Sequence, residues 1–378
     1  MEPNNNGTIA YHFSTLTDPR VEGRTDHKLI DIITIAICAV VCGADNWVDI
    51  ESYGKAKKDW LQSFLELPNG IPTQHTFRRL LMALSNDEFE TCFIKWVQSF
   101  CVSTVGRVIP IDGKTLRRSH DRSTGKSAIH MVNAWCSENG ICLGQIKTRE
   151  KSNEITAIPE LIKRIEINNC IVTIDAMGCQ THIAETIIKE GGDYILALKG
   201  NQGTLSKDVE LFFQDAIERK FKDIPFDSFE TIDGDHGRIE TRKIKTITDL
   251  GWLYGKEKWS NLNTIIMIQS ERDEGGKISN ETRYYISSVK DSAKNLLKAV
   301  RSHWGVENSL HWVLDIGFRE DESRIRKGQA TENFAILRNI ALNLLKQEKT
   351  AKFGIKARRL RAGWDNDYLL KVIAGQKI

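Results

Sequence analysis

Three carboxylates stand at positions where a sequence can build a metal site. Asp112 follows the apolar run "RVIPI", Asp175 follows "NCIVTI", and Glu307 lies in the aromatic segment "HWGVENSLHW". Carboxylates that converge repel one another and are costly to desolvate, and divalent cations remove that penalty. Mg²⁺ prefers such oxygen ligands, and two ions about 4 Å apart can promote displacement at a phosphodiester. The three residues therefore point to metal-dependent phosphodiester chemistry.

Glu307 also lies midway between two histidines, His303 and His311. Spacings of four residues put all three side chains on one helical face, which would suit a zinc site. However, zinc sites seldom draw three ligands from one straight helix, because tetrahedral geometry needs ligands from different elements. We therefore expect the histidines to orient Glu307 or to contact phosphates, and Trp304 and Trp312 to pack the helix. The nearby acidic run at 320–322 is an alternative source of the third ligand.

The segments around Asp112 and Asp175 predict a mixed α/β core. An apolar strand ends on Asp112 and a buried strand ends on Asp175. The predicted order is strand, strand, strand, helix, strand, helix, strand, at 107–112, 128–137, 140–149, 153–167, 169–175, 181–192 and 193–202. This order matches an RNase H-like mixed sheet, in which the first and fourth strands are neighbours. Asp112 and Asp175 would then lie side by side at carboxyl ends of strands, where sites in open α/β sheets form.

Changes in sequence pattern divide the chain into five regions. Residues 25–100 carry apolar positions at helical spacing, whereas residues 225–290 alternate apolar and polar around glycine turns at Gly234 and Gly275-Gly276. The predicted regions are 1–104 (helical N-terminal domain and candidate DNA-binding region), 105–222 (RNase H-like catalytic core, first part), 223–291 (inserted antiparallel β region), 292–345 (core, second part, with the Glu307 helix) and 346–378 (basic C-terminal tail).

The composition is that of a globular protein, with 378 residues, 40% of them hydrophobic and 27% charged. No apolar run reaches the roughly 18 residues of a membrane span. The start "MEPNNNGTIAYHF" is polar, so we expect no signal peptide. None of the eight cysteines forms a Cys-x2-Cys pair, which favours buried, reduced thiols. These features predict a cytoplasmic protein without a membrane segment.

Net charge is only +3, but residues 323–364 hold 11 Lys/Arg and 2 Asp/Glu. Such a stretch either follows DNA phosphates or forms a solvated helix face. Trp252 and Trp259 could stack on an unpaired base, although packing is the favoured role. Our candidates for DNA contacts are Lys114, Arg117, Arg118, Arg122, Lys199, Asn201, Gln202, Arg301, His303, His311, Arg324 and Arg326.

The chain resembles the DDE transposases of bacterial insertion sequences, specifically the H-repeat-associated group. The resemblance rests on "IPIDGKTLRRSHD", "VTIDAMGCQ", "YILALKGNQ", "DHGRIETR", "YYISSV" and "RSHWGVENSLHWVLDIGFREDESRIR". It implies an RNase H-like core with a β insert between the second aspartate and the glutamate. It also implies Mg²⁺-dependent cutting and joining of DNA ends, with Mn²⁺ able to substitute. Asp112, Asp175 and Glu307 would be the catalytic triad and the metal ligands.

One departure from the family pattern concerns the residues around Glu307. Many relatives carry a Tyr-x2-Arg-x3-Glu-x6-Lys signature, and this chain has Val300, His303 and Leu314 at its other three places. Either His303 takes the arginine's role on DNA phosphates, or Arg301 reaches across. The expected function is transposition, in which a nucleoid-associated dimer or larger assembly acts on element ends and target DNA. The alternative is a DNA-binding remnant of a degenerate element that no longer transposes.

Overall fold

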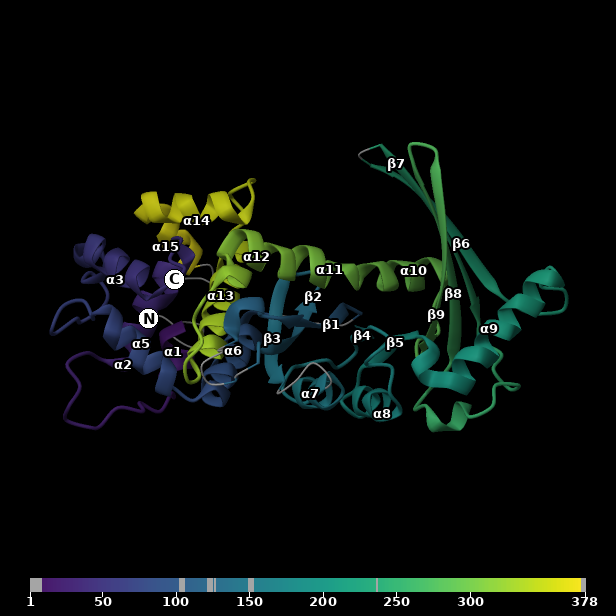
Figure 1. Ribbon diagram of the computed structural model, residues 1–378, viewed down its shortest axis with the longest axis horizontal. Coiled ribbons are helices and arrows are strands. Elements are labelled where there is room, and N and C mark those ends of the chain that lie inside the picture. The colour runs from purple at the N-terminus through teal and green to yellow at the C-terminus, as the bar shows by residue number, and fades with distance from the viewer. Residues whose placement is uncertain are drawn as a thin grey trace, which may run out of the picture.

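A nine-stranded mixed sheet runs through the middle and right of the molecule (Figure 1). The structure is a computed structural model that describes residues 9–101, 106–120, 125, 127–148, 153–235 and 237–374. The strand order is β3-β2-β1-β4-β5-β9-β8-β7-β6. The strands are β1 (Val108–Thr115), β2 (His130–Cys136), β3 (Ile141–Thr148), β4 (Ile171–Ile174), β5 (Asp193–Leu198), β6 (Asp227–Asp235), β7 (Arg238–Ile247), β8 (Thr264–Glu274) and β9 (Lys277–Ser287).

The first five strands confirm the predicted order of strands and helices. β1, β2 and β3 pair antiparallel, and β4 and β5 then join in parallel, reached through helices α7 (Glu154–Ile162) and α8 (Thr181–Lys189). As predicted, the first and fourth strands are neighbours. One boundary differs: β1 does not end on Asp112 but continues to Thr115. It continues because residues 113–115 still pair with residues 130–132 of β2.

Strands β6 to β9 form an antiparallel wing that extends the same sheet. The wing joins the first five strands where β5 pairs with β9, from Ile195↔Ser287 to Leu198↔Tyr284. The predicted turn at Gly275-Gly276 is confirmed, because Glu274 pairs with Lys277 across it. The predicted turn at Gly234 is wrong: Gly234 lies within β6, opposite Ile239. Helix α9 (Gly203–Glu218), which the sequence patterns did not reveal, packs against β9.

Helices gather at the other end of the molecule, where both termini lie (Figure 1). The predicted helical region is confirmed and consists of α1 (Ile9–Phe13), α2 (Leu29–Val41), α3 (Trp47–Ala56), α4 (Lys58–Leu61), α5 (Gln74–Ala83) and α6 (Asn86–Phe100). The buried helix α13 (Ala330–Gln347) packs against α2, α5, α6 and β3. The C-terminal helices α14 (Ile355–Trp364) and α15 (Asn366–Ile373) also contact α13. One hydrophobic cluster therefore spans the helical region and the sheet.

A row of helical segments crosses the sheet and carries Glu307 (Figure 1). It consists of α10 (Ala293–Ser302), α11 (Trp304–Val306), the π-helical turn η6 (Glu307–His311) and α12 (Trp312–Phe318). Ser292 caps the start of α10, because its side chain accepts a hydrogen bond from the Asn295 amide. Leu296, Leu297 and Val300 then bury their side chains in a cluster with wing residues. Packing of α10 against the wing thus fixes the position of this row of helices over the sheet.

All eight cysteines are free thiols, six of them buried, as expected. Among the described residues, no helix is both long and apolar enough to cross a membrane.

Candidate active site

The three predicted carboxylates line one cavity of about 350 Å³. Asp112 lies in β1 and Asp175 directly follows β4, and the preceding residues Ile111 and Ile174 pair in the parallel register. Glu307 opens the π-helical turn on the opposite wall. Other lining residues come from β4, β5, β9, α10 and α11. The sheet register and the helix that crosses it thus bring together side chains that are far apart in the sequence.

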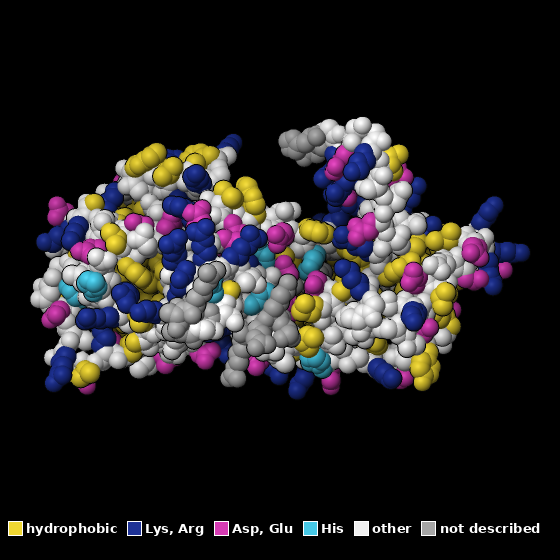
Figure 2. All heavy atoms as spheres, in the orientation of Figure 1, with side chains coloured by type: hydrophobic (Ala, Val, Ile, Leu, Met, Phe, Trp, Pro, Cys, Tyr) yellow, Lys and Arg dark blue, Asp and Glu magenta, His cyan; other side chains and the backbone are white. Residues whose placement is uncertain are grey.

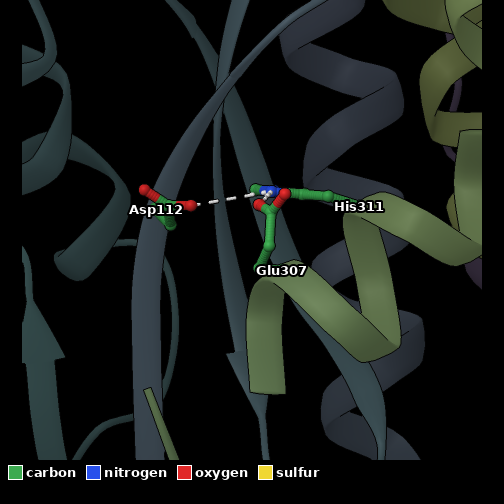
Figure 3. Close-up of side chains that lie close together, drawn as sticks. All are labelled: Asp112, Glu307 and His311. Atoms are coloured by element: carbon green, nitrogen blue, oxygen red, sulfur yellow. Dashed lines mark hydrogen bonds and ion pairs between the residues drawn. The ribbon is translucent and has the colours of Figure 1, made fainter. Parts of the chain in front are cut away.

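Asp112, Glu307 and His311 form the tightest part of this site (Figure 3). Nδ1 of His311 lies 3.2 Å from Oε2 of Glu307 and 3.6 Å from Oδ2 of Asp112. One ligand atom from each residue lies within 4.8 Å of the others, so the three could hold one ion. His303 is not in this group, although it lines the same cavity, and its Nδ1 lies 3.1 Å from Oγ1 of Thr173. The predicted histidine stripe therefore splits, and only His311 joins Glu307.

Electrostatics set Asp112 apart from an ordinary surface carboxyl. Burial, together with the neighbouring charges of Asp175, Glu154 and Glu307, raises the pKa of Asp112 to about 7. Burial also lowers the pKa of both His303 and His311, which favours neutral imidazoles. The cavity thus concentrates negative charge without a histidine cation to balance it.

A buried pair behind Asp112 was not found from the sequence. Nε2 of His130 lies 2.5 Å from Oε1 of Glu154, the first residue of α7. This pair occupies the space beside Gly113, where an added Cβ would lie 2.4 Å from His130 Nε2 and 2.5 Å from Glu154 Oε1. Neither residue stands in a motif with Asp112, so spacing gave no signal for this fourth acidic side chain.

The turn that holds Asp175 is braced from the "KGNQ" segment. Oδ1 of Asp175 accepts hydrogen bonds from the amides of Met177 and Gly178, at 3.0 and 3.3 Å. Asn201 donates its side-chain amide to the Ala176 carbonyl at 2.6 Å. Similarly, Gln202 donates to the Cys179 carbonyl at 2.7 Å. Asn201 and Gln202 therefore support the Asp175 turn, while the exposed Lys199 lines the cavity beside it.

Lys114 is buried and bridges the two elements that carry Asp112 and Glu307. Its Nζ lies 2.5 Å from Oδ1 of Asp315 and 2.8 Å from Oε2 of Glu320, and it donates to the His311 carbonyl at 3.4 Å. Burial opposes ionisation of Glu320, but Lys114 and Arg338 hold its pKa below the usual value. Lys114 is thus committed to ion pairs inside the protein.

The acidic run at 320–322 is also engaged away from the cavity. Glu320 pairs with Lys114, Asp321 lies 3.1 Å from Nε of Arg117, and Glu322 pairs with Arg319. None of these three carboxylates lines the cavity that holds Asp112, Asp175 and Glu307. The geometry therefore favours Glu307 over this run as the third ligand.

The other candidate DNA contacts are spread around the site. Arg117, Arg118, Arg301 and Arg324 are exposed. Arg301 also lies 3.0 Å from Asp233 of the wing, and Arg326 donates to the Arg118 carbonyl. Arg122 falls outside the described residues. Figure 2 shows Lys and Arg side chains beside a hollow between the wing and the C-terminal helices.

The tryptophans divide between the core and the surface. As expected, Trp259 is buried and Trp252 stacks on Phe212, with ring centroids 4.2 Å apart. The expectation that Trp304 and Trp312 pack the helix onto the sheet is wrong, because they are 51% and 60% exposed. Small aliphatic side chains, including Val306 and Leu310, fill that role instead. Trp304 instead makes a cation–π contact at the cavity, where the Arg283 guanidinium lies 5.4 Å from its ring centroid.

Comparison with known proteins gives matches along nearly the whole chain. Residues 103–344 match the family described as Transposase DDE domain, and residues 10–97 match the DDE_Tnp_1-associated family. YncI of Escherichia coli O157:H7, named as a candidate transposase, is 42% identical over 368 residues, which cover 96% of this chain and 93% of YncI. YhhI of Escherichia coli K12, named as an H repeat-associated candidate transposase, is 40% identical over 370 residues, covering 96% and 97%.

Two further matches are more limited. YbfQ of Escherichia coli K12, named as an inactive transposase, is 40% identical over 70 residues, which are 18% of this chain and 83% of YbfQ. Among solved structures, a piggyBac transposase synaptic complex with hairpin DNA gives an alignment that covers 98% of this chain and 79% of the piggyBac chain. Its TM-score is 0.40 at 11% identity, so this likeness carries no conclusion here.

Proposed function

The chain belongs to the DDE transposases, within their H-repeat-associated group, and from this premise we propose that it cleaves DNA at the ends of an insertion sequence and joins them to a target. The observation that carries the proposal is the convergence of Asp112, Asp175 and Glu307 on one cavity. We assign these three residues as the catalytic carboxylates.

The side chains of the cavity fit Mg²⁺, with Mn²⁺ as a substitute. All three residues offer the hard carboxylate oxygens that Mg²⁺ prefers. Burial and the neighbouring carboxylates raise the pKa of Asp112 to about 7, and a divalent cation would relieve the repulsion among these carboxylates. Two such ions held by Asp112, Asp175 and Glu307 would activate the attacking oxygen and stabilise the leaving oxygen.

We assign His311 to orienting Glu307. Its Nε2 is buried and has no hydrogen-bond partner in the part of the chain that the structure describes. A proton on Nε2 would leave a buried donor unsatisfied, so the tautomer with its proton on Nδ1 is favoured. That N–H faces Oε2 of Glu307 at 3.2 Å, with Asp112 beyond it. The remaining carboxylate oxygens stay available to a metal.

The DNA would lie in the hollow beside the wing (Figure 2). We propose phosphate contacts from the candidates whose side chains are spread around the carboxylate site, namely Arg117, Arg118, Lys199, Arg301, Arg324 and Arg326. Lys114, Asn201 and Gln202 would act indirectly, because their polar groups hold the helix and turn of the site.

The strand order β3-β2-β1-β4-β5 supports an RNase H-like core made of residues 105–222 and 292–345, with 223–291 inserted. We propose that two or more copies act together, since element ends must be paired before they are joined.

Strand cleavage tests the proposed function. The purified protein would be mixed with Mg²⁺ and duplex DNA carrying the sequences that flank its gene, beside Asp112→Asn, Asp175→Asn and Glu307→Gln. We expect cuts at fixed positions that disappear in all three variants and in EDTA. Glu322→Gln is the matched control, because Glu322 pairs with Arg319 outside the cavity.

The alternative function is a DNA-binding remnant that no longer transposes, and the naming of one relative as inactive makes it worth separating. DNA binding by wild type and variants alike, with no cleavage in Mg²⁺ or Mn²⁺, would favour the remnant. Cleavage that survives in Glu307→Gln would instead remove Glu307 from the triad.

A further inference from the structure

A second cavity of about 420 Å³ lies apart from the carboxylates, at the turn between β2 and β3. Residues 137–140 of that turn form one wall, and the end of α13 and the start of α14 form the other. Three cationic side chains line it, Lys346, Lys349 and Arg358, and Glu138 is its one acidic residue. The cavity is thus concave and positively charged.

Most polar groups around this cavity already have partners inside the protein. Arg358 donates to four backbone carbonyls, those of Leu345, Glu348, Ala351 and Phe353. The carboxylate of Glu138 accepts from the Val108 amide at 3.2 and 3.3 Å. The side chain of Ser137 donates to the Ser302 carbonyl. These groups shape the cavity but are not free to bind a ligand.

Lys346 and Lys349 differ, because neither ammonium has a hydrogen-bond or ion-pair partner in the part of the chain that the structure describes. Nζ of Lys346 lies 4.7 Å from the ring centroid of Trp135, which holds it over the cavity. Burial, together with the positive charges of Lys349 and Arg358, lowers the pKa of Lys346 to about 8. A desolvated ammonium among like charges is in an environment that an anion would relieve.

Five of the other nine Lys and Arg residues in 323–364 have partners inside the protein. Arg338 pairs with Glu320, Arg359 donates to the Val40 carbonyl of α2 and pairs with Asp45, and Arg361 lies over the ring of Tyr368. Much of the positive charge in 323–364 is therefore structural. Lys346 and Lys349 stand out because both line the cavity and the ammonium group of each is unpaired among the described residues.

We propose that Lys346 and Lys349 form a phosphate-binding pocket that takes a backbone phosphate of DNA outside the catalytic cavity. The proposal rests on the proposed function for the identity of the ligand. Trp135 lies between the two sites, since a Cβ added at Gly305 of α11, next to the exposed Trp304, would lie 3.8 Å from its Nε1 and 3.6 Å from Ser137 Oγ. A DNA strand that leaves the carboxylates along α11 would reach this pocket. The pocket would then fix the path of the DNA on the protein.

The test is the salt dependence of binding to duplex DNA in EDTA, so that no cleavage occurs. Each phosphate contact that is lost lowers the slope of log K against log salt by about 0.9. We expect Lys346→Met/Lys349→Met, which removes the whole pocket, to lower the slope by about 0.9, and Lys346→Met alone to lower it by no more than that. Lys207→Met, on the exposed face of α9, is the matched control and should leave the slope unchanged.

Each outcome decides between the proposals. An unchanged slope in the double variant, with normal wild-type binding, would overturn the pocket but leave the proposed function intact. No DNA binding by the wild type would overturn both. Titration with inorganic phosphate, followed by ³¹P NMR, separates the two sources of ligand. Phosphate binding lost in Lys346→Met while the DNA slope stays unchanged would assign the pocket to a free anion and reject DNA.

Discussion

Nζ of Lys114 lies 2.5 Å from Oδ1 of Asp315 and thereby ties the strand of Asp112 to the helix of Glu307. Lys114 follows Asp112 by two residues on the same strand face, and Asp315 follows Glu307 by eight residues along the helix. Two successive contacts, Asp112 with His311 and Lys114 with Asp315, therefore align strand and helix. The spacing of Asp112 and Glu307 depends on this alignment.

Replacing Lys114 by methionine should destabilise the protein and weaken metal binding. The change leaves the carboxylates of Asp315 and Glu320 without their cation, and breaking a buried pair costs about 3–5 kcal/mol. Urea denaturation measures that loss, and Mn²⁺ titration measures the affinity. Arg117→Met is the control, because its side chain is 81% exposed and its pair with Asp321 contributes little. A Lys114→Met protein with wild-type Mn²⁺ affinity would contradict the alignment role.

Divalent cations should stabilise the folded protein through the carboxylate cavity. A ligand that binds only the folded state raises its stability as its concentration exceeds the dissociation constant. We expect Mg²⁺ and Mn²⁺ to raise the melting temperature of the wild type, and to have a much smaller effect on Asp112→Asn and Glu307→Gln. Differential scanning calorimetry with Ca²⁺-free buffers measures the shift. Equal shifts in all three proteins would place the cation elsewhere.

Gly113→Ala should disable the site while a glycine substitution elsewhere is tolerated. An added Cβ at residue 113 would meet His130 Nε2 at 2.4 Å and Glu154 Oε1 at 2.5 Å, so the buried pair or β1 must move. Because Asp112 is the adjacent residue, we expect at least a tenfold loss of cleavage. Gly200→Ala is the control, since nothing lies within 4 Å of its added Cβ. Similar cleavage by both variants would refute this close-packing requirement.

Glu90 should make stability depend on pH. It is buried in α6, and burial raises its pKa to about 8, although the Gln145 amide donates to it at 2.8 Å. A raised folded-state pKa means that Glu90 contributes stability at low pH and loses it as pH rises from about 4 to 8. Over that window the wild type should lose about 1.4 kcal/mol per pH unit relative to Glu90→Gln. Parallel stability curves from urea denaturation would contradict this.

The proximity of Asp112 and Asp175 could be predicted because it follows from strand order. Asp112 and Asp175 each follow an apolar run, and parallel neighbours bring such residues together, as the register Ile111↔Ile174 confirms. The buried side of the site could not be predicted. Glu154 and His130 meet only through packing of α7 on β2, and Lys114 resembles any basic residue of an exposed turn until Asp315 and Glu320 surround it. Sequence spacing orders residues along an element but does not tell which elements face each other.

The π-helical turn from Glu307 to His311 changes the phase of the helix that contains it. Each residue of an α-helix advances by about 100°, so a wider turn rotates everything after it relative to everything before it. The turn therefore allows one face of α10 to pack on the wing while a differently oriented face of α12 meets Lys114. Deleting one residue between Glu307 and His311 would keep both side chains in the chain and yet turn one of them away from Asp112.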